Sequence, residues 1–456
     1  MNVRRLFGII AASMLASSVC NAAPASGDIE NYLKPFVDTN NFSGSVLVTQ
    51  KGRTLFEKSY GFADREHHVP NGADTRFHIA SVSMLFTAFA TMRLVEQGKL
   101  SLDTNVSSIV GPLPNGDRIT VRELLEENSG LPDFNDLADY DALVAVHQTP
   151  ESVIQQIRGL KPRFEPGGKH TDEEHSAYNA LALIIERKTG LPFAQAMQTL
   201  VFGPAGMRDS GVDDDGPIGG HVALGYKPEG ESGLTRAKVI HWSAKPGNGS
   251  AYSTADDINR WFGEFLGDKL LSAKSREIML ASDRTDDGFG WEKGMDDRFG
   301  EDSFFSNGRG PGFSSVMYNL PREGVTVILV SNIEHDMNPS VAGNILALVV
   351  GKPYAPFAYQ PFPMTPDQRR SSVGRFRFGA DFYRENAALE IKDSPHGLVL
   401  EWPGGPEAPL LPTGANSFID RYYWTPVTLV RDKADRPVAL KYGKFQGTIG
   451  GKPQSP

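Results

Sequence analysis

Residues 77–103, FHIASVSMLFTAFATMRLVEQGKLSLD, carry the clearest helical pattern in this 456-residue chain. The pattern predicts a buried helix over residues 80–97, and Ser81 then lies in its first turn. Apolar residues recur at the spacing of one helix face, and a glycine that can end the helix follows them: Leu85, Phe89, Met92 and Gly98.

Met84 ends the sequence Ser81-Val82-Ser83-Met84, which has the frame of an S-x-x-K nucleophile motif. In that motif the lysine shares a helix face with the serine, so its amine can accept or relay the serine proton. Methionine has no basic nitrogen, and general-base help of about 10² to 10⁴ in rate corresponds to roughly 2 to 5 kcal/mol of barrier. Either another base acts on Ser81 or the site does not turn over. Methionine at this spacing is also ordinary core filler, and serine is a common helix cap.

Residues 1–22 have the pattern of a secretory signal, with Arg4 and Arg5 before an apolar stretch that is too short to span a bilayer comfortably. We therefore expect a periplasmic or secreted protein with no stable membrane anchor. Cys20 is the only cysteine and would leave with the signal, so disulfides and thiol chemistry are not expected in the mature chain.

The composition is that of an ordinary globular protein, with 40% hydrophobic and 22% charged residues. The formal net charge of −9, together with the lack of a basic run, argues against nucleic acid as a partner. The length predicts about two to three domains.

Two hairpin patterns frame the first 350 residues, one over 45–60 and one over 314–331, and helical patterns lie between and around them. A proline-rich stretch suggests a linker over 351–371, and residues 372–456 show short alternating strands that predict a small all-β domain. Helices are expected at 29–37, 121–126, 136–147, 151–159, 178–189 and 339–350.

Five fragments, in this order along the chain, resemble the serine β-lactamase and penicillin-binding-protein superfamily, in its class C β-lactamase, esterase and D-peptidase branch. The resemblance covers residues 28–350, and the tail is similar to the small β domain often appended there. It implies an α+β fold in which an antiparallel sheet is flanked by helices, with a helical lobe inserted and the active site between the lobes. The fragments are Phe77–Ser83, Leu94–Asp103, Ser129–Pro132, Tyr252–Asp257 and Pro311–Ser315.

The resemblance also implies three site motifs: S-x-x-K, Y-x-N, and K-T-G or H-x-G. Ser81 matches the nucleophile, and its own N–H would be an oxyanion donor. The second motif falls on Glu173-Glu174-His175 when counted back from Tyr178, or on Asp172-Glu173-Glu174 when counted forward from Pro166, and neither reading supplies a tyrosine. The third falls on Ser306-Asn307-Gly308, which keeps the glycine and lacks the cation or imidazole.

A rebuilt base is the natural replacement for the missing lysine. His175 or Glu173 is the candidate, with a carboxylate orienting the histidine as in a catalytic triad. The alternative is that this segment is a solvated acidic loop ahead of a helix. Arg309, with Ser306 and Gly308, is the candidate binding group for a substrate carboxylate.

No cofactor and no metal are expected. His170 and His175 are five residues apart without an H-E-x-x-H pattern, and no later ligand cluster completes a zinc site.

Two functional hypotheses remain open. The first is an exported serine hydrolase or acyl transferase that acts on an ester, amide or peptide bond through an acyl-Ser81 intermediate. Its substrate would be a small molecule or a peptide, including a cell-wall-derived one. The second is a catalytically silent binding protein of the same fold.

Overall fold

The computed structural model describes residues 26–168, 174–214, 216–280, 287–294, 296–300, 303–357, 359–360, 362–405 and 407–450. The expected signal segment 1–22, with Cys20, lies outside these ranges. Within them, no helix combines the length and the apolar character needed to cross a membrane.

A seven-stranded antiparallel sheet forms the centre of the molecule, in the order β10-β11-β12-β13-β14-β1-β2. The opening and closing hairpins predicted from the sequence meet in it, because β1 pairs with β14 and places Gly44 opposite Ser331. The strands β1, β13 and β14 are buried almost throughout, so helices must cover both faces. The strands are β1 (Gly44–Gln50), β2 (Arg53–Tyr60), β10 (Asp287–Gly288), β11 (Trp291–Lys293), β12 (Phe304–Gly310), β13 (Phe313–Leu320) and β14 (Val325–Ser331).

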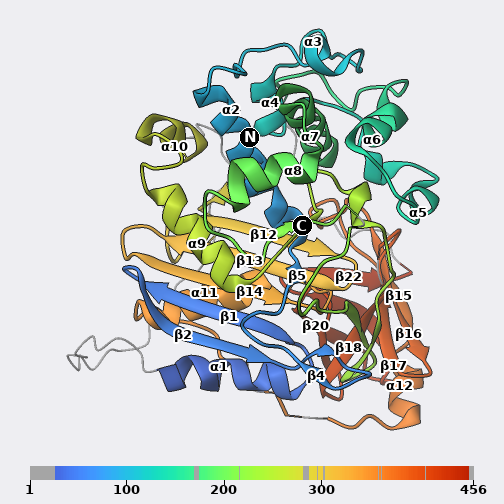
Figure 1. The fold of residues 1–456 in the computed structure, drawn as a ribbon. Coiled ribbons are helices and arrows are strands. Elements are labelled where there is room, and N and C mark those ends of the chain that lie inside the picture. The colour runs from blue at the N-terminus through green and yellow to red at the C-terminus, as the bar shows by residue number, and fades with distance from the viewer. Residues whose placement is uncertain are drawn as a thin grey trace.

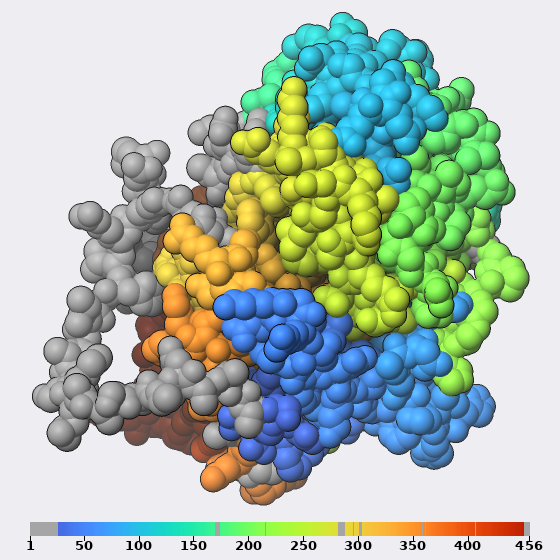
Figure 2. Space-filling model, turned by 60° about the vertical axis from the view of Figure 1, so that its left-hand side comes forward, coloured from blue at the N-terminus to red at the C-terminus, as the bar shows by residue number. Residues whose placement is uncertain are grey.

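One face of the sheet is covered by α1 (Ser26–Asp38) and α11 (Asn338–Val349), which share a hydrophobic core with alternate residues of β1, β13 and β14. The other face packs against α2 (Ser83–Glu96) and α9 (Ala255–Leu266). Figure 1 shows α1 along the lower side of the sheet and the helical lobe above it. Figure 2 shows α9 and α10 (Ala273–Leu280), in yellow, between the cyan part of the lobe and the blue opening strands.

The helical lobe is built around α7 (His175–Thr189), which is buried along most of its length and contacts α2, α4 and α6. Its other helices are α3 (Ser107–Val110), α4 (Val121–Leu125), α5 (Tyr140–Leu143), α6 (Pro150–Ile157) and α8 (Phe193–Met197), with a π-helical turn η3 (Gln198–Phe202).

The prediction of one helix over residues 136–147 is wrong. Only a 3₁₀ turn, η2 (Phe134–Asp136), and the single-turn α5 form there. The reason lies in the tertiary structure, because backbone groups of this segment form hydrogen bonds with residues 241–243, which are distant in the sequence. The carbonyl of Val144 accepts the His241 N–H at 2.8 Å, and the N–H of Gln148 donates to Ser243 Oγ at 3.2 Å.

Smaller sheets and turns join the lobe to the centre. Strands β5 (Phe77–His78), β9 (Ala251–Ser253) and β6 (Gly211–Val212) form one three-stranded sheet. Two separate hairpins are β3–β4 (Phe62–Asp64, Val69–Pro70) and β7–β8 (Tyr226–Glu229, Gly233–Arg236), and η4 (Trp242–Ala244) is a 3₁₀ turn.

The C-terminal strands form a closed antiparallel barrel around its own hydrophobic core, shown in red in Figure 1. The predicted fold class, an α+β sheet domain followed by a small all-β domain, is confirmed. The expected linker contains a helix, α12 (Pro366–Ser372), which Thr365 caps and Pro366 begins. The barrel strands are β15 (Gly374–Arg377), β16 (Ala388–Ser394), β17 (Gly397–Glu401), β18 (Glu407–Gly414), β19 (Ser417–Asp420), β20 (Thr425–Arg431), β21 (Pro437–Tyr442) and β22 (Phe445–Ile449).

Candidate active site

Ser81 lies in a 3₁₀ turn, η1 (Ala80–Val82), that leads directly into α2. It is partly exposed, whereas Ala80 and Val82 are buried. Ala80 has a φ of 46°, in the left-handed region that alanine rarely adopts, so the backbone just before Ser81 is strained. The turn is held from β9, since the Ala251 carbonyl accepts the Ile79 N–H at 3.1 Å and the Ala251 N–H donates to Ser83 Oγ at 3.1 Å.

Strand β12 passes directly against this turn at Gly308. A β-carbon at position 308 would lie 2.8 Å from the Ser81 nitrogen and 2.3 Å from the Ile79 carbonyl oxygen. The same carbonyl oxygen accepts a hydrogen bond from Ser315 Oγ at 2.6 Å. Only glycine fits so close an approach. The backbone of β12 therefore lies beside the Ser81 N–H. An oxyanion site formed by the Ser81 turn and β12 together would require this arrangement.

A cavity of about 340 Å³ opens in front of Ser81, within the size range of small-molecule sites. Its walls come from the helical lobe, from the segment before β9 and from the end of β12. The lining residues are Ala80, Ser81, Asn135, Tyr140, His175, Trp242, Lys245, Asn248, Gly249, Asn307, Arg309, Gly310, Pro311 and Asp336.

Met84 faces a second, smaller cavity of about 40 Å³ that also touches Ser81. Met84 is only 4% exposed and belongs to the main hydrophobic core. Ser306 also lines this smaller cavity, together with two carboxylate residues, Glu127 and Glu292. The residue three positions after Ser81 is thus beside the serine and carries no group that can take its proton.

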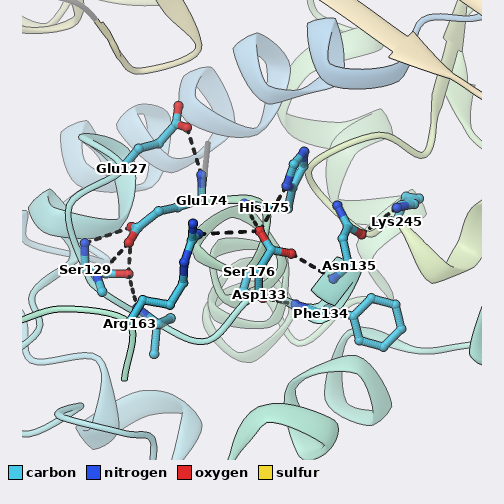
Figure 3. Close-up of polar contacts among 12 residues, drawn as sticks. Glu127, Ser129, Asp133, Phe134, Asn135, Arg163, Glu174, His175, Ser176 and Lys245 are labelled. Atoms are coloured by element: carbon cyan, nitrogen blue, oxygen red, sulfur yellow. Dashed lines mark hydrogen bonds and ion pairs between the residues drawn. The ribbon is translucent and has the colours of Figure 1, made fainter. Parts of the chain in front are cut away.

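His175 is the first residue of α7, and its ring is engaged by a carboxylate. Its Nδ1 lies 3.0 Å from Asp133 Oδ2, and its backbone N–H donates to the same oxygen at 3.3 Å (Figure 3). Asp133 Oδ1 accepts the Asn135 N–H at 2.8 Å. Burial raises the pKa of Asp133, but the bonds from His175 and Asn135 and the charge of Arg163 outweigh it and hold the pKa below its ordinary value. Asp133 is therefore an anion at neutral pH.

The loop that carries Asp133 is fastened to the start of α7. The buried Glu174 carboxylate accepts the N–H groups of Ser129, at 2.8 Å, and Gly130, at 2.7 Å, and the Ser129 hydroxyl at 2.9 Å (Figure 3). Ser176 Oγ accepts the Phe134 N–H at 2.8 Å. These bonds place Asp133 next to His175. Glu173, the other candidate base from the sequence, lies outside the described residues.

Lys245 is a cavity residue that the sequence analysis did not identify. Its Nζ donates to Asn135 Oδ1 at 2.6 Å and lies 4.6 Å from the centre of the Tyr140 ring. Burial lowers the pKa of Lys245 to about 8, although the charge of Asp133 acts in the opposite direction. The one available signal was its position, a few residues before the recognised fragment Tyr252–Asp257.

Arg309 also lines the cavity. It forms an ion pair with Asp336, with an Nη1–Oδ2 distance of 3.2 Å, and its guanidinium lies over the rings of Tyr422 and Tyr423. Of the three binding candidates, Arg309 is in the main cavity, Ser306 is in the smaller one, and Gly308 touches the Ser81 turn. Asn307 lines both cavities and so lies between Ser306 and Arg309.

Among the residues that the structure describes, none forms a hydrogen bond with the Ser81 hydroxyl. The described residues also include no cluster of three or more His, Cys, Asp or Glu side chains with the arrangement of a metal site.

Comparison with known proteins identifies the family. The Beta-lactamase family model matches residues 29–352. The chain belongs to the β-lactamase family. This confirms the resemblance found in the sequence, which is to the serine β-lactamase and penicillin-binding-protein superfamily.

Two curated relatives within the β-lactamase family come from Bacillus subtilis (strain 168). The chain is 31% identical to the putative penicillin-binding protein PbpX over 309 residues, which cover 68% of this chain and 74% of PbpX. It is 27% identical to penicillin-binding protein 4* over 411 residues, which cover 84% of this chain and 89% of that protein.

Solved structures of the β-lactamase fold are also similar. The penicillin-binding protein from Bacillus halodurans has 26% identity and a TM-score of 0.60, and the match covers 70% of this chain and 98% of that one. D-amino acid amidase from Ochrobactrum anthropi SV3 has 22% identity and a TM-score of 0.58, covering 67% and 91%. The octameric penicillin-binding protein homologue from Pyrococcus abyssi has 21% identity and a TM-score of 0.63, and its match reaches 92% of this chain and 99% of that one. Because their identities are only 22% and 21%, the last two structures show a shared fold and nothing about activity.

Proposed function

We propose that this β-lactamase-family chain is a serine hydrolase or acyl transferase in which Ser81 is acylated and the Asp133–His175 pair is the base. Met84 would then occupy the position of the family lysine without its function. The proposal is carried by one observation: an imidazole held by a buried, ionised carboxylate lines the same cavity as Ser81. We also propose that the chain is exported and that residues 1–22 direct this export.

The proposed reaction uses the two His175 nitrogens for different tasks. Ser81 Oγ attacks the carbonyl carbon of an ester or amide while Nε2 of His175 takes the hydroxyl proton. Asp133 holds the ring through Nδ1–H and stabilises the imidazolium. The carbonyl oxygen becomes an oxyanion beside the Ser81 N–H. His175 then protonates the leaving group, and a water or acceptor hydroxyl attacks the acyl-serine by the reverse sequence.

The charges of the cavity favour a substrate with an anionic group. Lys245 and Arg309 contribute two cations to the lining, and Asp336 contributes one anion. A carboxylate near Arg309 would receive charge-assisted hydrogen bonds. Since the curated relatives are named penicillin-binding proteins, we propose a small acyl donor or peptide, including a cell-wall-derived one.

Covalent labelling tests this proposal. A fluorophosphonate probe should label the unmodified chain at Ser81, and Ser81→Ala should abolish the label while Ser371→Ala, an exposed serine on α12, should keep it. His175→Ala and Asp133→Asn should each slow labelling by about 10² to 10⁴. Unchanged labelling in His175→Ala would show that the base is another group.

A second candidate, a catalytically silent binding protein, has its own support. Met84 is packed into the core beside Ser81, and no described residue bonds the Ser81 hydroxyl. This candidate predicts that benzylpenicillin or D-alanyl-D-alanine raises the melting temperature with no turnover, and equally so in Ser81→Ala. At a hundredfold excess over Kd, the added stability would be about 2.7 kcal/mol.

A further inference from the structure

The last residue of β19 and the turn that follows it, residues 420–423, contact the sheet domain. The shape of this turn is set by Asp420, which is fully buried. Asp420 Oδ1 accepts the N–H groups of Tyr422, at 2.7 Å, and Tyr423, at 3.0 Å. The other oxygen accepts the Tyr442 hydroxyl at 2.9 Å. The turn is therefore rigidly held from inside the barrel.

Arg421 anchors this turn to the sheet domain. It is fully buried, and its guanidinium donates to the Gly230 carbonyl at 2.7 Å, in the β7–β8 hairpin, and to Asn41 Oδ1 at 2.9 Å, just after α1. Each of these bonds is needed, because a guanidinium that stays buried without its partners costs free energy. The barrel thus keeps a fixed position relative to the cavity.

Tyr422 and Tyr423 contact the cavity lining directly. The Arg309 guanidinium carbon lies 5.2 Å from the Tyr422 ring centre and 5.6 Å from that of Tyr423, within the range of cation–π contacts. The Tyr422 carbonyl accepts the Asp336 N–H at 2.6 Å. Both charged residues at this end of the cavity are therefore held by the barrel.

The same tyrosine supports the turn that follows β12. The Tyr422 hydroxyl donates to Glu334 Oε1 at 2.9 Å, and Glu334 Oε2 accepts the Gly312 N–H at 3.0 Å. The backbone around Gly310 and Pro311, which lines the cavity, is linked through these bonds to the barrel.

We propose that the barrel turn 420–423 is part of the substrate site, where Tyr422 and Tyr423 position Arg309 to receive the anionic group of the acyl donor. This rests on the proposed function for the acyl donor itself. An arginine side chain has many rotamers, and stacking on two rings removes most of that freedom before the ligand binds. Tyr422 and Tyr423 are positioning residues, because they act through Arg309.

A matched pair of esters tests the proposal on the full chain. Mono-4-nitrophenyl glutarate carries a carboxylate, and 4-nitrophenyl hexanoate has a similar length without one. Tyr422→Leu and Tyr423→Leu should each raise KM for the glutarate about five- to twentyfold and leave KM for the hexanoate within twofold. Tyr422→Phe keeps the ring under Arg309 and should change the selectivity little. Tyr383→Leu, at a barrel tyrosine that is 66% exposed, is the matched control and should change neither value.

A binding measurement separates this proposal from the proposed function. In a Ser81→Ala background, calorimetry gives the Kd of glutaric acid monoanilide and of neutral butyranilide without any turnover. If the unmodified chain neither labels nor hydrolyses, the proposed function fails, and the Kd values alone decide the role of the turn. A weakening confined to the anionic ligand in Tyr422→Leu supports it.

Equal weakening of both ligands, or none, overturns the proposal. Should Tyr422→Leu fail to fold, Arg309→Lys provides the second test, because it keeps the charge and loses the planar stacking. Arg309→Lys should then weaken binding of the anionic ligand and leave binding of the neutral ligand unchanged.

Discussion

Gly308 lies so close to Ser81 that a β-carbon on it would be 2.8 Å from the Ser81 nitrogen. The contact joins β12 of the sheet to the 3₁₀ turn that carries the serine. The sheet thus fixes the position of the Ser81 turn, and the absence of a side chain at position 308 is a requirement of this contact.

Gly308→Ala should displace the Ser81 turn. We expect fluorophosphonate labelling to slow at least tenfold and the free energy of unfolding to fall by about 1 to 3 kcal/mol from overpacking. Gly263→Ala in α9 is the control, because a β-carbon there meets nothing within 4 Å. It should be neutral or stabilise by up to about 1 kcal/mol. Normal labelling in Gly308→Ala would contradict the close contact.

Met84→Lys should place an amine beside Ser81, in the small cavity that Glu127 and Glu292 also line. If the pocket is a latent family site, hydrolysis of 4-nitrophenyl esters should rise by tens-fold, within the range that general-base help supplies. Met84→Leu conserves volume and should cost less than about 1.5 kcal/mol with no change in rate. A Met84→Lys protein that folds and is no faster would count against a latent lysine site.

Lys245 should make anion binding depend on pH. Its pKa is lowered by burial to about 8, so its positive charge is present below pH 8 and is lost as pH rises through 8. The Kd of glutaric acid monoanilide, measured by calorimetry in the Ser81→Ala background, should therefore rise severalfold from pH 7 to pH 9.5, because the cavity then loses one of the two cations that attract the carboxylate. Lys245→Met should remove this transition. Its persistence in Lys245→Met would assign it to another group.

Asp420 should make the stability of the chain fall between pH 4 and pH 6. Burial raises the pKa of Asp420 to about 6, above the ordinary aspartate value in the unfolded chain. The native state therefore binds the proton more tightly than the unfolded state. Its contribution is fully present below pH 4 and is lost as pH rises through 6, at a cost of about 3 kcal/mol.

The difference in unfolding free energy between Asp420→Asn and the unmodified chain tests this pH dependence. Urea unfolding at pH 4.5 and pH 7.5 should show the variant gaining stability relative to the unmodified chain at the higher pH. A constant difference between the two proteins would mean that Asp420 does not titrate in this window. The comparison cancels the contributions of the other carboxyl groups, which both proteins share.

Local pattern was enough to place the Ser81 turn and the sheet. The apolar spacing after Ser81 predicted α2, and the two hairpin patterns predicted the strands that meet in the sheet. Gly308 was also identifiable, because a glycine on an edge-strand motif signals close approach. These features depend on neighbouring residues, whose preferences the sequence shows directly.

His175 was a candidate from the sequence, but in a different setting. It was expected in a polar segment ahead of a helix, and it is the first residue of α7. A carboxylate partner was expected, but Asp133 was not identified as that partner, because it reaches His175 only through the bonds between Glu174 and the Ser129-Gly130 turn. Lys245 gave no pattern at all, since its environment is made by Asn135 and Tyr140 from another segment.

The sequence by itself determined the family, the fold class and the serine at the start of a buried helix, because periodicity and short motifs act over a few residues. Only the tertiary structure decided which side chains surround that serine, and that Tyr422 of the barrel lies against Arg309. Charges and hydrogen-bond partners are fixed by distance in space, and residues far apart along the chain become neighbours only when the hydrophobic cores bring their elements together.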